Sequence, residues 1–187
     1  MADMSVAFRE IAAARSTVIA DLGLEPGSYL VVTAHRAGNV DDPARLELLV
    51  ELLEALPVPV VFPVHPRTRA RLEAAGLMDR LSGLTLAPPL GYLDFLELAR
   101  HARAVLTDSG GVQKEAYLLG VRCVTLRDTT EWVETVETGW NVLVGLDREA
   151  ALAALERTPP ADRPELYGGG RAAERVRDAV SAYTPRV

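Results

Sequence analysis

The residues with the clearest chemical potential are Asp108-Ser109-Gly110-Gly111, which separate a strand-like run, Ala104-Val105-Leu106, from a helix-like segment, Val112 to Leu119. A strand that turns at once into a helix leaves the first backbone N–H groups of that helix unpaired, and an anion can accept them. The two glycines let the backbone approach the anion closely, and Ser109 can either cap the helix or donate its hydroxyl. The spacing predicts a phosphate-binding turn, with a plain tight turn and a serine cap as the alternative.

A carboxylate stands one helical turn beyond the two glycines. Glu115 lies four residues after Gly111. A side chain at that position is placed to accept hydrogen bonds from the hydroxyls of a sugar.

Two histidines follow other strand-like runs in the same way. His35 and Arg36 come directly after the apolar run Ser28 to Ala34, and His65 follows the run Val58 to Val64. A structural histidine that bonds a neighbouring carbonyl, beside a surface arginine, is the alternative interpretation. The repeated position at the end of a strand favours a binding role.

A further polar segment, Arg127-Asp128-Thr129-Thr130-Glu131, also follows a strand-like run. Two hydroxyls before an acidic residue are typical of a helix cap of the Thr-x-x-Glu kind. Because capping and ligand binding are compatible, this segment remains a candidate for the site.

Apolar runs and segments with helical periodicity alternate along the chain. This order implies right-handed βαβ units and an α/β, Rossmann-like parallel sheet with helices on both faces. Ligands of such sheets bind beyond the carboxyl ends of the strands, so the polar segments are expected on one rim. Helices are predicted over residues 5–22, 46–56, 68–75, 92–102, 112–119, 131–136, 148–156 and 171–183, and strands over residues 28–34, 58–64, 84–86, 104–107, 123–126 and 141–144.

Composition narrows the classes of partner. The chain has 187 residues and a formal net charge of -6, which argues against a general affinity for nucleic acid. The single cysteine, Cys123, excludes a disulfide framework and a cysteine-built metal site within one chain, and we expect no metal. The first residues lack a basic region followed by an apolar stretch, and no apolar run is long enough to span a bilayer. We therefore expect a cytoplasmic protein with no membrane partner.

Together these segments resemble the carboxyl-terminal half of the non-hydrolysing UDP-N-acetylglucosamine 2-epimerases, which are relatives of the two-domain GT-B glycosyltransferases. The resemblance covers the chain from about residue 20 to residue 145, in the order that the family has. It rests on Val32-Thr33-Ala34-His35-Arg36, Pro63-Val64-His65-Pro66, Pro89-Leu90-Gly91-Tyr92-Leu93-Asp94-Phe95, residues 106–116 and Leu126-Arg127-Asp128-Thr129-Thr130-Glu131-Trp132.

The resemblance implies UDP and UDP-N-acetylglucosamine as ligands, no cofactor, and a role for each candidate residue. Ser109, Gly110 and Gly111 would hold the diphosphate, which His35 would reach as the catalytic residue of this half. Glu115 would accept hydrogen bonds from the ribose hydroxyls, Phe95 would pack on the uracil ring, and the backbone near Leu90 would contact the edge of that ring. Arg36 and His65 resemble positions that in some members contact a second, activating UDP-sugar, and Arg127 and Glu131 would line the sugar end. One position departs from the family, because Gly38 stands where an acidic residue is usual.

The resemblance also implies how the chain is organised. We expect a single UDP-binding domain over residues 1–187, with a linker helix over 1–23, an α/β core over 24–157 and a terminal crossover helix over 165–184. The amino-terminal domain of the family, which carries the acid and base groups, is expected to be absent. Since the terminal helix would then expose an apolar face, a homodimer is predicted, with a rearrangement of the domain as the alternative.

The function expected is half of an epimerase that interconverts UDP-N-acetylglucosamine and UDP-N-acetylmannosamine by elimination and re-addition of UDP. The isolated chain is expected to be inactive. The donor-nucleotide domain of a GT-B glycosyltransferase, a hydrolysing 2-epimerase and a non-catalytic nucleotide sensor are the alternatives.

Overall fold

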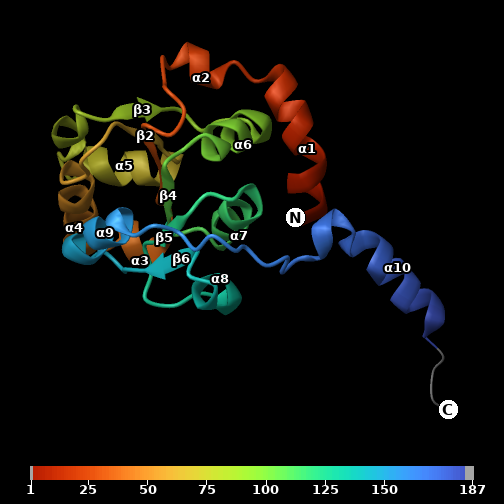
Figure 1. Cartoon of the computed structure of the whole chain (residues 1–187). Coiled ribbons are helices and arrows are strands. Elements are labelled where there is room, and N and C mark those ends of the chain that lie inside the picture. The colour runs from red at the N-terminus through yellow and green to blue at the C-terminus, as the bar shows by residue number, and fades with distance from the viewer. Residues whose placement is uncertain (1, 184–187) are drawn as a thin grey trace.

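A six-stranded parallel sheet with the strand order β3-β2-β1-β4-β5-β6 forms the centre of the computed structural model, which describes residues 2–183 (Figure 1). Each strand coincides with an apolar run of the sequence, so the predicted parallel α/β sheet is confirmed. The strands are β1 (Leu30–Thr33), β2 (Val60–Pro63), β3 (Thr85–Ala87), β4 (Ala104–Thr107), β5 (Cys123–Thr125) and β6 (Asn141–Leu143).

Helices cover both faces of the sheet, as the alternation of elements predicts (Figure 1). The main helices are α1 (Ala2–Arg15), α4 (Pro43–Glu54), α5 (Pro66–Ala74), α6 (Tyr92–Arg100), α7 (Gly110–Leu119), α9 (Arg148–Glu156) and α10 (Ala172–Ala182). Shorter pieces are α2 (Val18–Asp21), α3 (Ala37–Val40), η1 (Met78–Leu81), α8 (Val133–Glu137) and η2 (Gly168–Gly170), of which α3, η1 and η2 were not among the predicted helices.

The central strands are buried on both sides because their apolar residues alternate between two cores. Leu30 and Val32 of β1 pack in the core beneath α4, α5 and α9, whereas Val31 packs in the core beneath α6 and α7. Strands that are covered on both faces read as continuous apolar runs, which is why the sequence showed them clearly.

The predicted single helix over residues 5–22 is wrong, because the chain breaks after Arg15 and resumes as α2. The Ser16 hydroxyl donates to Asp94 Oδ1 at 2.6 Å and accepts from the Val18 backbone N–H at 3.4 Å. A serine hydroxyl that bonds the backbone locally offers an alternative to the helical ladder. The break directs α1 along α6 (Figure 1).

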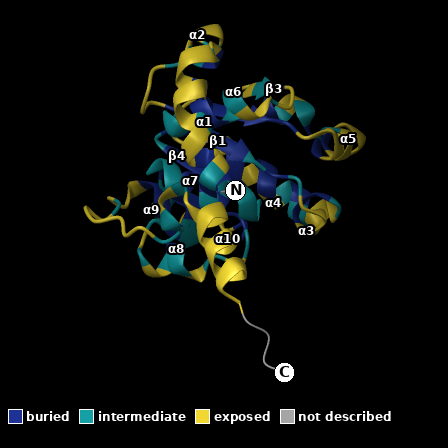
Figure 2. Cartoon of the chain, turned by 90° about the vertical axis from the view of Figure 1, so that its right-hand side faces the viewer, coloured by how far each residue is buried: buried dark blue, intermediate teal, exposed yellow. Residues whose placement is uncertain are grey.

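The two ends of the described chain meet at the start of α10. Asp3 of α1 accepts hydrogen bonds from the backbone N–H groups of Ala172 and Ala173, at 2.9 and 2.8 Å. These bonds lower the pKa of Asp3 and satisfy N–H groups that a helix start leaves unpaired. The remainder of α10 is exposed, Val176 and Val180 included (Figure 2). Thr184, the last residue of the predicted terminal segment, lies outside the described residues.

Within residues 2–183 no helix is both long and apolar enough to cross a membrane. The predicted domain limits of 1–23, 24–157 and 165–184 stay predictions.

Phe62→Ala is expected to lower the free energy of unfolding by about 3–5 kcal/mol, because the Phe62 ring is fully buried in β2 and its loss leaves a cavity. Urea denaturation measures the change, with Val133→Ala, at an exposed position, as the control. A loss for Phe62→Ala no larger than that of the control would contradict the described core.

Candidate functional site

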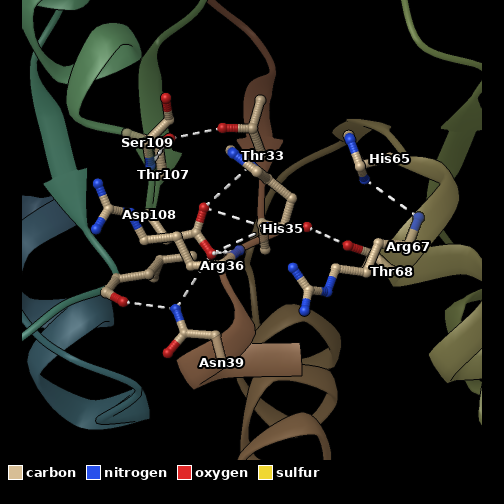
Figure 3. A network of polar contacts seen from close by, with 12 residues as sticks. Thr33, His35, Arg36, Asn39, His65, Arg67, Thr68, Thr107, Asp108 and Ser109 are labelled. Carbon is tan, nitrogen blue, oxygen red and sulfur yellow. Dashed lines mark hydrogen bonds and ion pairs between the residues drawn. The ribbon is translucent and has the colours of Figure 1, made fainter. Parts of the chain in front are cut away.

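A buried carboxylate at the end of β4 organises the rim of the sheet (Figure 3). Asp108 accepts hydrogen bonds from the backbone N–H groups of His35 and Arg36, both at 2.9 Å, and from Asn39 Nδ2 at 3.3 Å. Its Oδ1 atom lies 3.3 Å from His35 Nδ1. These groups meet because β1 and β4 are parallel neighbours in register, so the residues that follow them leave the sheet at the same edge. Asp108 therefore fixes the chain that carries His35 and Arg36.

Paired threonines at the ends of β1 and β4 hold the glycine turn. Thr33 Oγ1 and Thr107 Oγ1 lie 2.6 Å apart, and Thr107 Oγ1 accepts from the Ser109 backbone N–H at 2.9 Å (Figure 3). Ser109 occupies the N-cap position of α7, yet its side chain makes no capping bond. The serine-cap alternative is therefore wrong, and no hydrogen bond from the Ser109 hydroxyl to the described residues is found.

The start of α7 is open to an anion. Within the described residues, the backbone N–H groups of Gly110 and Gly111 have no acceptor, as expected for the first turn of a helix. A Cβ atom on Gly110 would lie 3.2 Å from Glu131 Oε2 and 3.4 Å from Trp132 Nε1, so a side chain there would crowd both. Trp132 Nε1 also donates to the Gly110 carbonyl at 2.7 Å, and this hydrogen bond holds the turn against the segment that follows β5.

A pocket of about 250 Å³ opens beside this turn. Its lining combines apolar side chains with hydroxyl, imidazole and carboxylate groups, a mixture typical of small-molecule sites. It is lined by Thr33, His35, Pro63, His65, Pro89, Leu90, Tyr92, Phe95, Ser109, Val112 and Glu115. Six of the residues selected from the sequence thus share one cavity, namely His35, His65, Leu90, Phe95, Ser109 and Glu115.

The two histidines of the pocket lie close to one another, and their Nδ1 atoms have different partners. Their ring centroids lie 5.3 Å apart. His65 Nδ1 accepts from the Arg67 backbone N–H at 3.1 Å, so the proton of a neutral ring is on Nε2. His35 Nδ1 instead lies 3.3 Å from Asp108 Oδ1, and Nε2 of His35 has no hydrogen-bond partner among the described residues.

Glu115 and Tyr92 both line the pocket and influence each other electrostatically. Only 8% of Glu115 is exposed, and burial raises the pKa of its carboxyl group, while interaction with the Tyr92 hydroxyl lowers it. Tyr92 is a pocket residue that the sequence reasoning missed. The available signal was its position one helical turn before Phe95, on the same face of α6.

Arg127 and Glu131, which were predicted for the sugar end, form a group next to Gly110 with Arg36, which was predicted for a second, activating UDP-sugar. Arg127 donates to both oxygens of Glu131, at 2.9 and 2.8 Å, and Arg36 Nη2 lies 3.8 Å from Glu131. Hydrogen bonds from Arg127 lower the pKa of Glu131 to about 2. Two guanidinium groups share the Glu131 carboxylate beside the start of α7, and the negative charge of Asp108 also acts on Arg127.

The Thr-x-x-Glu cap is also wrong. Helix α8 begins at Val133 with Trp132 at its N-cap and no side-chain cap, and Thr130 instead accepts from the Trp132 backbone N–H at 3.1 Å. Thr130 Oγ1 donates to Gln113 Oε1 at 2.6 Å, which ties the segment to α7. Gln113 is fully buried, and its Nε2 atom has no partner among the described residues.

Gly38, the departure from the family, lies in α3 at an exposed position. A Cβ atom there would meet nothing within 4 Å. The neighbouring Asn39 holds the local structure instead, since its Nδ2 atom donates to the Leu126 carbonyl at 2.8 Å and to Asp108.

The sequence model of the family UDP-N-acetylglucosamine 2-epimerase matches residues 1–181. The chain belongs to this family. It is 43% identical over 156 residues to a UDP-N-acetylglucosamine 2-epimerase homolog of Methanococcus maripaludis, covering 82% of the chain and 44% of the relative. It is 45% identical over 176 residues to the UDP-2,3-diacetamido-2,3-dideoxy-D-glucuronate 2-epimerase of Pseudomonas aeruginosa, covering 90% of the chain and 48% of the relative.

Solved epimerase structures have the same fold. The UDP-GlcNAc 2-epimerase of Methanocaldococcus jannaschii, in complex with UDP-GlcNAc and UDP, superposes with a TM-score of 0.83 at 37% identity, covering 96% of this chain and 52% of that one. The predicted carboxyl-terminal half of a GT-B fold is confirmed. The chain spans about half the length of the epimerases that it matches.

Asp108→Asn is expected to lower the free energy of unfolding by about 2–3 kcal/mol, because an amide replaces a charged acceptor and directs an NH₂ group at buried donors. Chemical denaturation measures the loss. Asp162→Asn, at an exposed carboxylate, is the matched control and is expected to change little. Equal stability of the two variants would show that the Asp108 charge does not organise the rim.

Proposed function

We propose that this chain is the UDP-sugar-binding half of a UDP-N-acetylglucosamine 2-epimerase. The observation that carries the proposal is the single pocket in which the open start of α7, an apolar wall and a buried carboxylate lie side by side. The M. jannaschii enzyme, whose structure was solved in complex with UDP-GlcNAc and UDP, supports the same ligand class.

The parts of UDP correspond to the parts of this pocket. Ser109 and the backbone N–H groups of Gly110 and Gly111 donate to the diphosphate, since a helix start favours an anion. Glu115 accepts from the ribose hydroxyls. The ring of Phe95 packs on the uracil, and the backbone near Leu90 reads its edge.

The contribution of this half to catalysis is the stabilisation of UDP as it leaves. In the proposed reaction UDP departs from the sugar by elimination, 2-acetamidoglucal forms, and UDP adds again to the opposite face. His35, held by Asp108, and the start of α7 stabilise the negative charge that develops on the diphosphate. The groups that move the proton at the sugar belong to the other half of the enzyme.

Arg127 and Glu131 are proposed to line the sugar end, and Arg36 and His65 to contact a second, activating UDP-sugar. The guanidinium groups of Arg36 and Arg127 both lie beside Glu131. UDP-2,3-diacetamido-2,3-dideoxy-D-glucuronate is a second candidate substrate, favoured by the 45% identity to the Pseudomonas enzyme and by guanidinium groups that suit a sugar carboxylate.

We further propose that the protein acts in the cytoplasm as a homodimer in which α10 contributes contacts between copies. Val176 and Val180 are 63% and 70% exposed on that helix, so an apolar face is available. Analytical ultracentrifugation tests the dimer, and a monomer at all concentrations would contradict it.

Ser109→Ala and Glu115→Gln are each expected to weaken UDP binding by about 1–3 kcal/mol, because each removes a hydrogen bond in a partly buried site. Isothermal titration calorimetry with UDP measures the change. Ser181→Ala on exposed α10 is the control and is expected to bind as the unaltered chain does. Unchanged affinity of Ser109→Ala and Glu115→Gln would exclude the assigned roles.

The 187-residue chain alone is expected to bind UDP but not to epimerise either nucleotide sugar, because it spans about half the length of its relatives. A coupled assay with UDP-N-acetylglucosamine, and a second with the diacetamido glucuronate, measures turnover. Formation of the manno epimer by the purified chain would contradict the proposed division of labour between the two halves.

A further inference from the structure

Tyr92 lines the pocket together with Glu115, and it also contacts α1, which lies outside the pocket. It stands at the first position of α6, and 39% of it is exposed. Its hydroxyl oxygen lies 3.2 Å from Ser5 Oγ. A residue of the amino-terminal helix is thereby linked to the wall of the pocket.

The ring of Tyr92 is held from the same side. Phe8 of α1 packs edge-on against it, with ring centroids 6.0 Å apart and an interplanar angle of 89°. Ser5 is only 1% exposed, and α1 packs on both α6 and α7. Edge-to-face contact and a hydroxyl partner together restrict the Tyr92 side chain to one orientation.

That orientation matters because Glu115 is a buried carboxyl group. Burial raises the pKa of Glu115, and interaction with the Tyr92 hydroxyl works against that rise. Burial likewise raises the pKa of Tyr92, and the negative charge of Glu115 adds to it. The two side chains are therefore electrostatic neighbours, in agreement with their shared place in the pocket wall.

We propose that Tyr92 is a positioning residue that, held by Ser5 and Phe8 of α1, directs the Glu115 carboxylate at the ribose and makes the site select ribose over 2′-deoxyribose. The proposal rests on the proposed function, since it takes UDP as the ligand. A carboxylate held in one orientation accepts from the 2′-hydroxyl, and a ligand without that hydroxyl leaves a buried acceptor unpaired. Selection of ribonucleotides then depends on Tyr92, although the carboxylate that accepts the hydrogen bond belongs to Glu115.

Titration calorimetry with UDP and with 2′-deoxy-UDP tests this role. The unaltered chain is expected to prefer UDP by about tenfold, the value of one hydrogen bond. Tyr92→Phe is expected to lower the preference to about threefold or less while the affinity for 2′-deoxy-UDP stays the same. Ser5→Ala, which leaves Tyr92 in place, is also expected to lower the preference for UDP, by a smaller factor than Tyr92→Phe does.

Tyr183→Phe is the matched control, because it removes a tyrosine hydroxyl at a position that is 73% exposed, and its preference is expected to equal that of the unaltered chain. Melting temperatures of all variants separate loss of fold from loss of selection, and Ser5→Ala carries the test if Tyr92→Phe fails to fold. Equal loss of affinity for both nucleotides, or an unchanged preference, would overturn the role of Tyr92. Absence of any UDP binding by the unaltered chain would instead overturn the proposed function, and this proposal with it.

Discussion

The rim of this sheet depends on the buried charge of Asp108. A carboxylate that is taken out of water must be compensated by donors, and here the donors come from one short segment, the backbone N–H groups of His35 and Arg36 with the Asn39 amide. The segment after β1 is therefore bound to the end of β4. The same carboxylate faces the His35 ring, so the group that satisfies a folding requirement also orients the histidine of the candidate site.

Helix α7 joins the separate parts of the site because residues at successive positions along it contact different parts of the site. Its first turn offers backbone N–H groups to an anion, and Gln113 in the next turn binds the loop that carries Arg127 and Glu131. Glu115 faces the pocket from the same helix. Relative positions along a helix are rigid, so the distance between the glycine turn and the Glu115 carboxylate is set by helix geometry. The loop that carries Arg127 and Glu131 then places its side chains against a rigid helix.

Helix α1 connects the pocket beside the glycine turn with the other end of the described chain. Ser5 and Phe8 contact Tyr92 in the pocket wall, and Asp3, on the same helix, caps α10. The break at Ser16 makes this arrangement possible, because a continuous helix would leave the sheet in another direction. A segment remote in sequence from the glycine turn thus becomes a support for the site.

The sequence by itself determined the sheet, the glycine turn and six of the residues that share the pocket. Strand β4 and helix α9 begin and end as predicted because their signals, an apolar run and a 3.6-residue period, are local. The rim position of His35, His65 and Ser109 followed from the common direction of parallel strands. Only the tertiary structure decided that Asp108 binds the segment after β1, that Gln113 holds Thr130, and that Tyr92 stands between α1 and Glu115. These partners are far apart in the sequence, by 87 residues for Ser5 and Tyr92, and only folding brings them together. The periodicity of a segment indicates which of its faces is buried, but it does not indicate which side chain of another segment packs there.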